Sequence, residues 1–129
     1  TVTWVPVSAK RLRRRGYDQA RLLAEAACRR WDTVPEALLK KCGDNPAQSG
    51  LSDAAARRAN VLGMYDPADP ARIRGRRILL IDDVCTTGAT LAECARTLRE
   101  AGAQTVVCAA VALRRREEQR DDSRQNQKP

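Results

Sequence analysis

A short apolar run in the middle of the chain, Ile78 to Ile81, shows no alternation of polar and apolar residues. A strand with this pattern is covered on both faces, which is typical of parallel sheets in α/β proteins. We expect this strand to end at Asp82. From Thr90 onward the apolar positions recur at helical spacing, and Gly102 follows as a stop signal. The pattern therefore predicts a buried strand, a loop and a helix in succession.

Weaker patterns predict the remaining elements. Val2 to Val7 is typical of a first strand, and the basic segment from Lys10 to Gly16 is interpreted as a loop that ends in glycine. Asp18 can cap a helix that runs to about Trp31. Further expected elements are a strand at Ala37–Cys42, a helix from a Ser52 cap through Arg58, a strand at Gly63–Tyr65 and a last buried strand at Thr105–Leu113. Together these elements predict an α/β fold, an open and mainly parallel twisted sheet flanked by helices.

The composition indicates one domain with an aliphatic core. The chain has 129 residues, of which 43% are hydrophobic but only 3% aromatic, and phenylalanine is absent. A chain of this length can bury a single core, which must be built from Ala, Val, Leu and Ile. We expect the domain to cover residues 1–113. Residues 114–129 are charged and rich in Gln without an apolar stripe, so they are predicted to form a disordered tail.

Charge and cysteine content narrow the class of protein. Lys and Arg number 24 against 16 Asp and Glu, and the resulting net charge of +8 suits phosphates or nucleic acid, although it also serves solubility. The five cysteines include no Cys-x-x-Cys pair, and the chain has no histidine to complete a zinc site. We interpret them as reduced thiols of a cytoplasmic protein, and we expect Cys28, Cys94 and Cys108 to be buried. No apolar run approaches the roughly 20 residues of a membrane span.

The loop between the central strand and its helix carries the candidate chemistry. Ligands of open α/β sheets lie beyond the carboxyl ends of the strands, where the next helix presents free N–H groups. In that place the chain has Thr86, Thr87, Gly88, Ala89 and Thr90. Glycine lets the backbone approach an anion, and the hydroxyls can donate to phosphate oxygens. Neither the P-loop nor the dinucleotide pattern is present, so a phosphate cradle of another kind is predicted.

Two adjacent acids, Asp82 and Asp83, precede this loop. They would repel a phosphate, but the vicinal hydroxyls of a ribose, with a divalent cation nearby, are suitable partners for carboxylates. The alternative is a solvated acidic turn that only caps the following helix. The hydroxyl-rich loop and the helix behind the pair favour the ligand site.

These residues resemble a known family. Ile78 to Thr90, with four apolar residues, two acids and a Thr/Gly-rich loop, closely resembles the phosphoribosyl diphosphate (PRPP) binding motif of type I phosphoribosyltransferases. Other segments are similar to the ComF family of competence-associated phosphoribosyltransferase-like proteins, namely Val5–Val7, Arg14–Gln19, Gln48–Leu51, Arg57–Arg58 and Asn60–Val61. The similarity covers most of residues 1–113. The family pattern prefers Phe and Asn where Tyr17 and Asp18 stand, and the hood and the N-terminal zinc-binding segment are expected to be reduced or absent.

The resemblance implies Mg²⁺-dependent transfer of phosphoribose from PRPP to a nitrogenous acceptor, with release of pyrophosphate. Asp82 and Asp83 would hold the ribose and, through its hydroxyls or water, the metal. The loop Thr86–Thr90 would bind the 5′-phosphate. The resemblance also implies a pyrophosphate-binding group of Ser8, Ala9, Lys10 and Arg11, and a mobile loop with Gln48, Ser49, Arg57 and Arg58.

Other functions stay open at this level. The chain could be a PRPP-binding protein without catalysis, or a ComF-like accessory protein in DNA uptake or processing. Direct nucleic-acid binding through Lys10 to Arg15 is a third reading, and a homodimer is also left open. Some purine phosphoribosyltransferases have an acid at the position of Thr86, so its absence argues against a hypoxanthine/guanine type. Nothing else in the sequence names the acceptor.

Overall fold

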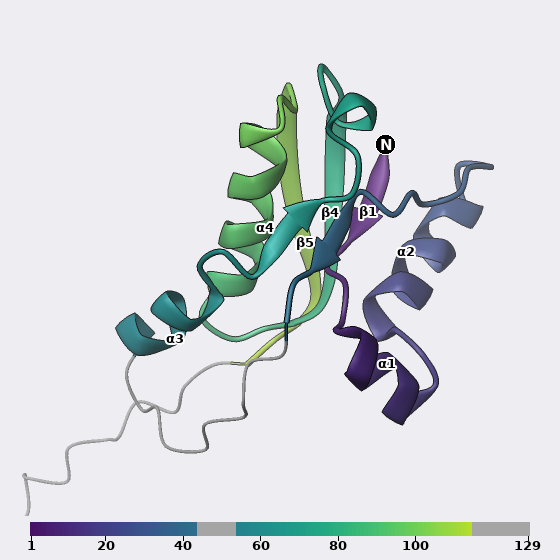
Figure 1. Ribbon diagram of the computed structural model, residues 1–129. Helices are drawn as coiled ribbons and strands as arrows, with labels where there is room; N and C mark the ends of the chain where they lie inside the picture. Colours follow the sequence, from purple (N-terminus) through teal and green to yellow (C-terminus); the bar gives the residue numbers. More distant parts are fainter. Residues whose placement is uncertain (44–53, 115–129) are drawn as a thin grey trace, which may run out of the picture.

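The computed structural model describes residues 1–43 and 54–114, except for the side chains at positions 54 and 57. A parallel sheet consists of β1 (Val2–Trp4), β4 (Arg77–Cys85) and β5 (Thr105–Leu113), with β4 in the middle. Helix α2 (Gln19–Arg29) packs on one face and α4 (Ala89–Glu100) on the other (Figure 1). The predicted α/β fold with a helix-flanked parallel sheet is confirmed.

The apolar run in β4 contributes to two separate clusters of buried side chains. Ile78 and Leu80 pack with residues of α4, whereas Leu79 and Ile81 pack with residues of α2. Successive side chains of a strand point to opposite faces, so both sets must be apolar when each face is covered by a helix. This arrangement explains why the run shows no alternation.

The first strand is shorter than predicted. The strand β1 ends at Trp4, although the Val5 amide still donates to the Ile81 carbonyl at 2.9 Å. Pro6 has no N–H to continue the ladder, so the chain leaves the sheet there.

The prediction of a basic loop is wrong, because residues Ala9–Arg15 form the helix α1. The Ser8 hydroxyl accepts from the Arg11 amide at 3.2 Å, which caps the first turn. Gly16 ends the helix in the left-handed region, with φ of 80°, as the predicted glycine stop requires. Arg and Lys are good helix formers, so this segment needs no apolar stripe to form two turns beside the sheet.

A second, antiparallel sheet joins β2 (Leu39–Lys41) to β3 (Tyr65–Pro67). Both strands lie close to their predicted places, but β3 begins where the expected strand at Gly63–Tyr65 should end. The helix α3 (Ala54–Val61) precedes β3, and its expected cap Ser52 lies outside the described residues. A 3₁₀ turn, η1 (Pro70–Arg72), follows β3 and leads toward β4.

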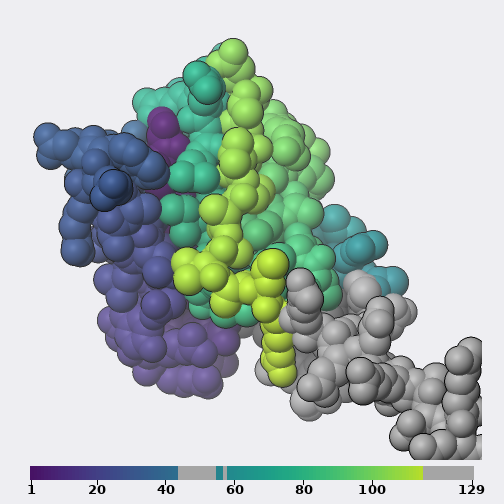
Figure 2. Space-filling view, turned by 180° about the vertical axis from the view of Figure 1, so that it is seen from behind, coloured from purple at the N-terminus to yellow at the C-terminus, as the bar shows by residue number. Residues whose placement is uncertain are grey.

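The last strand, β5, has its predicted bounds, but the prediction that it is buried is wrong. Val107, Val111 and Leu113 are 57%, 69% and 74% exposed, and β5 lies at the surface in Figure 2. Helix α2 packs on β1 and β4, and the neighbouring face of β5 is left uncovered by described residues. Cys108, on the opposite face of β5, is also exposed, contrary to the prediction, whereas Cys28 and Cys94 are buried as expected.

The predicted tail, residues 114–129, lies outside the described residues apart from Arg114. Among the helices that the structure describes, none has the length and hydrophobicity needed to cross a membrane.

Candidate functional site

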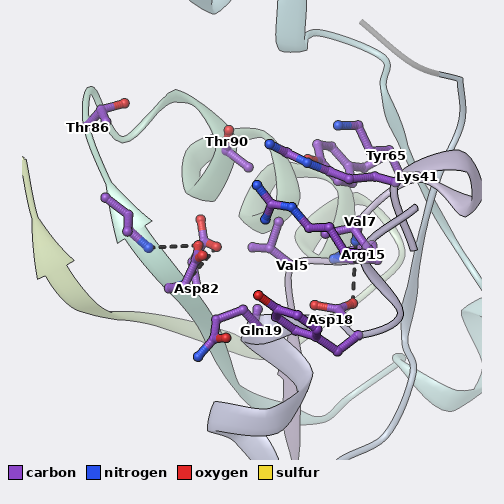
Figure 3. Close-up of a pocket in the computed structure, with 16 residues that line it drawn as sticks. Val5, Val7, Arg15, Asp18, Gln19, Lys41, Tyr65, Asp82, Thr86 and Thr90 are labelled. Carbon is purple, nitrogen blue, oxygen red and sulfur yellow. Dashed lines mark hydrogen bonds between the residues drawn. The ribbon is translucent and has the colours of Figure 1, made fainter. Parts of the chain in front are cut away.

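A cavity of about 410 Å³ lies at the carboxyl end of the parallel sheet. The end of β4, the helix α1, the start of α2, the first turn of α4 and the β2–β3 pair all contribute to its walls (Figure 3). The lining is Val5, Pro6, Val7, Arg11, Arg15, Tyr17, Asp18, Gln19, Ala20, Lys41, Tyr65, Asp82, Asp83, Val84, Thr86 and Thr90. The predicted acids, part of the phosphate loop and part of the basic segment therefore meet in one place.

Asp82 and Asp83 both line the cavity, but they do not follow the strand as predicted. The ladder between β4 and β5 continues to Cys85, so both acids lie within β4. By strand alternation, Asp82 continues the face of Leu80, toward α4, and Asp83 continues the face of Ile81, toward α2. Both carboxylates nevertheless line the same cavity, where Asp83 lies close enough to Asp82 to raise its pKa.

The two carboxylates are held by the backbone of the strand itself. An Asp82 oxygen accepts from the Asp83 amide at 2.9 Å, and an Asp83 oxygen accepts from the Val84 amide at 2.8 Å. Each carboxylate keeps further lone pairs for a ligand, since an ionised carboxylate has about four acceptor sites. Their geometry suits hydroxyl donors such as those of a sugar.

Asp82 is only 8% exposed, and its pKa is raised to about 7, mainly because burial disfavours the charged carboxylate. Its neighbour Asp83, through a side-chain hydrogen bond and its charge, and more weakly the charge of Asp18 contribute to the same rise in pKa. Asp82 is therefore partly protonated near neutral pH without a ligand. A cation or hydroxyl donors in the cavity would favour its ionised form.

This pKa predicts a specific dependence of stability on pH. The unfolded Asp has a pKa of about 3.9, so between about pH 4 and pH 7 the folded chain binds more protons at Asp82 than the unfolded chain does. The free energy of unfolding should therefore fall as the pH rises through this window. Asp82→Asn should remove that contribution. The measurement is chemical denaturation of both proteins between pH 4.5 and pH 8, and equal slopes for the two would contradict the raised pKa.

The loop before α4 has the features of an anion cradle. Gly88 caps the helix in the left-handed region with φ of 78°, and the Thr87 hydroxyl accepts from the Ala89 amide at 3.3 Å. Among the described residues, the amides of Thr90 and Leu91 have no hydrogen-bond partner. Two free N–H groups at a helix N-terminus favour an anion there.

The predicted loop residues do not all face the cavity. Thr86 and Thr90 line it, whereas Thr87, Gly88 and Ala89 do not. Thr87 and Gly88 shape the turn, and the backbone of the first helical turn supplies the donors.

Only one of the four predicted pyrophosphate residues lines the cavity. Arg11 does so, while Ser8 is buried as the cap of α1 and Ala9 and Lys10 are exposed outside the lining. Because the segment is a helix, Arg11 is followed four residues later, on the same face, by Arg15, which also lines the cavity. The helix replaces the predicted contiguous loop with an Arg11–Arg15 pair.

Asp18 was predicted only as a helix cap, but its carboxylate also holds two neighbouring segments of the site together. Its carboxylate accepts from the Trp4 indole N–H at 3.1 Å and from the Arg21 amide at 3.3 Å, and the Val7 amide lies at 3.5 Å. The cap role at Arg21 was predictable from the sequence, but the contacts with β1 and the following loop depend on the tertiary fold. Asp18 thereby ties α2 to the loop that leads into α1.

Two residues of the β2–β3 pair, Lys41 and Tyr65, also line the cavity without having been predicted. Of the predicted mobile-loop residues, Gln48 and Ser49 lie outside the described residues. Position 57 belongs to α3, and Arg58 is exposed on the same helix. Arg58 does not belong to the lining of the cavity.

The chain is similar in sequence to a known protein family and to several known proteins. The family described as phosphoribosyl transferase domain matches residues 13–127. The chain is 37% identical to competence protein F of Haemophilus influenzae over 105 residues, which cover 79% of this chain and 45% of that protein. It is 35% identical to DNA utilization protein YhgH of Escherichia coli O6:H1 over 106 residues, which cover 79% of this chain and 44% of that protein.

A shorter stretch is more similar to another group. Over 45 residues, 35% of this chain and 24% of the relative, the chain is 62% identical to adenine phosphoribosyltransferase of Mycobacterium avium. The chain spans less than half the length of each of these relatives. The match to the domain family covers most of the chain. The chain therefore belongs to the type I phosphoribosyltransferase family, as a member of its competence protein F group.

Proposed function

We propose that this protein binds PRPP together with Mg²⁺ and transfers its phosphoribosyl group to a nitrogenous acceptor, releasing pyrophosphate. The observation that carries this proposal is the division of charge in one cavity. Asp82 and Asp83 of β4 line it together with Arg11 and Arg15 of α1, and Thr90, in the first turn of α4, lines it as well. A ligand with ribose hydroxyls and two separate phosphate groups fits such a distribution.

Each part of the cavity has a role in this proposal. The first turn of α4 binds the 5′-phosphate through the Thr90 and Leu91 amides. Asp82 and Asp83 accept hydrogen bonds from the ribose hydroxyls and stabilise the positive charge that develops at the anomeric carbon. Arg11 and Arg15 neutralise the leaving pyrophosphate, and their fixed spacing on the helix favours one orientation of PRPP.

The residues present fit a metal that arrives with its ligand. Among residues 1–43 and 54–114, no group of three or more His, Cys, Asp or Glu could hold a metal ion. Mg²⁺ commonly uses one or two carboxylates together with substrate phosphates and water. Asp82 and Asp83 would hold it, directly or through ribose hydroxyls and water, and the ion would supply positive charge for the pyrophosphate.

The first acceptor to test is adenine. The relatives that share the 45-residue stretch are named adenine phosphoribosyltransferases. Thr86, exposed at the start of the loop, offers no carboxylate for the handling of a base proton. Other nitrogenous bases belong in the same screen.

Calorimetric titration with PRPP, with and without Mg²⁺, tests the binding part of the proposal. A pyrophosphate-release assay over adenine and other bases then tests transfer. We expect PRPP to bind in the presence of Mg²⁺ and at least one base to release pyrophosphate. An absence of PRPP binding would refute the proposed function.

A non-catalytic, PRPP-binding role in DNA uptake or processing is the second candidate. The favouring observation is the outer face of α1, where Lys10, Arg13 and Arg14 are exposed and do not line the cavity. Such a face suits a nucleic-acid backbone, and two relatives bear the names competence protein F and DNA utilization protein. PRPP binding without turnover of any base would favour this role.

The two faces of α1 allow the two uses of its charge to be separated. The double variant Arg11→Gln with Arg15→Gln should bind PRPP tenfold or more weakly, roughly the effect of losing one hydrogen bond to a charged group. Its affinity for ribose 5-phosphate should fall much less. Arg13→Gln with Arg14→Gln is the matched control and should leave PRPP binding nearly unchanged. If α1 contacts nucleic acid, this second pair should lower oligonucleotide affinity and flatten its salt dependence. Equal losses of PRPP and ribose 5-phosphate in the first pair would contradict the pyrophosphate role.

A further inference from the structure

Asp18 is an acid in the wall of a cavity that is assigned to anionic groups. It lines the cavity together with Asp82 and Asp83 (Figure 3). The proposed function uses those two acids for the ribose hydroxyls, but it gives Asp18 no ligand. A carboxylate close to phosphate groups is unfavourable because like charges repel. The place of Asp18 in this wall therefore needs another physical reason.

The carboxylate of Asp18 accepts hydrogen bonds from three segments of the chain. Its Oδ2 accepts from the Trp4 indole N–H at 3.1 Å and, more weakly, from the Val7 amide at 3.5 Å (Figure 3). Its Oδ1 accepts from the Arg21 amide at 3.3 Å. Within residues 1–43 and 54–114, Asp18 takes part in none of the ion pairs. This half-buried carboxylate thus binds N–H groups of its own chain and not the cations of the cavity.

The helix α1 depends on its flanking segments for its position. None of its seven residues is buried, so no side chain of the helix anchors it in the core. Val7 lies just before the cap of α1, and Asp18 lies just after the glycine that ends it. The contact between Asp18 and Val7 therefore closes a loop around α1 and holds both of its ends together.

We propose that Asp18 is a positioning residue of the PRPP site, an inference that rests on the proposed function. By accepting from Trp4 and Val7, its carboxylate holds α1 in one orientation relative to the sheet. Trp4 ends β1, which pairs with β4, so the helix is fixed relative to the strand that carries the two acids. In this orientation Arg11 and Arg15 line the cavity.

A carboxylate suits this role better than the amide of the same shape. Both oxygens of a carboxylate are acceptors, whereas an amide has one acceptor oxygen and an NH₂ donor. In Asp18→Asn the NH₂ group would face either the Arg21 amide or the N–H groups of Trp4 and Val7, and two donors cannot bond to each other. The change in charge has the opposite effect, since a neutral amide would repel phosphates less. The sign of the change in PRPP affinity therefore separates positioning from charge.

The experiment compares Asp18→Asn and Asp18→Ser with the control Asp69→Ser. Serine is a good helix cap, so Asp18→Ser can keep the contact with the Arg21 amide, but its single hydroxyl cannot also bind Trp4 and Val7. Asp69 likewise caps a turn with its carboxylate, and it lies outside the cavity lining. Calorimetry with Mg²⁺ present would use PRPP, inorganic pyrophosphate and ribose 5-phosphate as three separate ligands.

We expect both Asp18 variants to bind PRPP and pyrophosphate about tenfold more weakly, roughly the effect of losing one hydrogen bond to a charged group. The affinity for ribose 5-phosphate should fall much less, because the α4 amides and the β4 acids lie on other elements. Asp69→Ser should change the affinity for none of the three ligands.

The indole N–H of Trp4 gives a spectroscopic measure of the contact itself. Its resonance in ¹H–¹⁵N spectra is identified by its loss in Trp4→Phe, and its exchange with water should be faster in Asp18→Ser. Trp4→Phe keeps an aromatic ring and removes the donor, so it should show part of the same loss of PRPP affinity. It replaces Asp18→Ser if that variant unfolds.

Tighter PRPP binding by Asp18→Asn would show that Asp18 acts through its charge alone and would overturn the inference. Unchanged PRPP affinity in Asp18→Ser, or an equal loss of ribose 5-phosphate, would overturn it as well. If the wild-type chain bound pyrophosphate but not PRPP, the proposed function would fail, whereas a loss of pyrophosphate binding in Asp18→Ser would still support the positioning role. A wild-type chain that bound neither ligand would refute both.

Discussion

Replacing both acids, Asp82→Asn with Asp83→Asn, should weaken PRPP binding by at least about 100-fold. Each carboxylate is assigned a charge-assisted hydrogen bond to a ribose hydroxyl or to metal-bound water, and such a bond contributes about 1.5–3 kcal/mol. Every 1.4 kcal/mol is about tenfold in affinity, so the loss of two such bonds accounts for this effect. The measurement is calorimetric titration with PRPP and Mg²⁺.

The double variant should nevertheless fold. Asp82 is buried and its pKa is raised to about 7, so its ionised form is unfavourable in the unliganded protein, and a neutral amide removes that penalty. Asp69→Asn is the matched control. Asp69 caps the turn η1 outside the cavity, where asparagine caps equally well. A double variant with wild-type PRPP affinity would disprove the ribose-holding role.

The second large effect is expected from Gly88→Val, which should lower the affinity for ribose 5-phosphate by tenfold or more. The backbone at Gly88 has φ of 78°, and a residue with a side chain pays about 1–2 kcal/mol there, with a β-branched residue among the worst. The turn would relieve this strain by moving, and the Thr90 and Leu91 amides would no longer converge on the phosphate. An added Cβ itself meets only the Cys85 sulfur at 3.9 Å, so the fold has room for it.

Gly75→Val is the control that separates the effect of backbone strain from the effect of a distorted phosphate-binding loop. Gly75 has φ of 72°, and an added Cβ there meets nothing within 4 Å, so the backbone penalty is similar. Gly75 lies outside the cavity lining, and ribose 5-phosphate should bind to this variant as to the wild type. Normal binding by Gly88→Val would show that the 5′-phosphate lies elsewhere.

The elements with strong local signals were predictable from the sequence. The helix α2 begins after Asp18, as expected, because a side-chain cap and an apolar stripe depend only on residues within a few turns. The strand–loop–helix order around Gly88 follows from the same kind of local evidence. The helix α1 was missed because a charged segment has no apolar stripe, although its Ser8 cap and Gly16 stop were both visible in the sequence.

The residue at which β4 ends is decided by its pairing with β5 and could not be predicted from the local sequence. The apolar run stops at Ile81, but β5 pairs with β4 as far as Cys85, and Arg114 also donates to the Cys85 carbonyl at 3.0 Å. Hydrogen bonds to a neighbouring strand satisfy the backbone whether or not the side chains are apolar. The two acids are therefore part of a strand, and one of them is buried.

The phosphate loop and the acids could be recognised from their residues because they are adjacent in the chain. The opposite wall could not, since Arg15, Lys41 and Tyr65 are separated from Asp82 by 17 residues or more in the sequence. Residue type and spacing determine which local turn or helix forms, because these depend on backbone propensity and short-range hydrogen bonds. Which charges share a cavity is decided by the packing of α1 and of the β2–β3 pair at the sheet edge, and this packing depends on contacts between segments that are distant in the sequence.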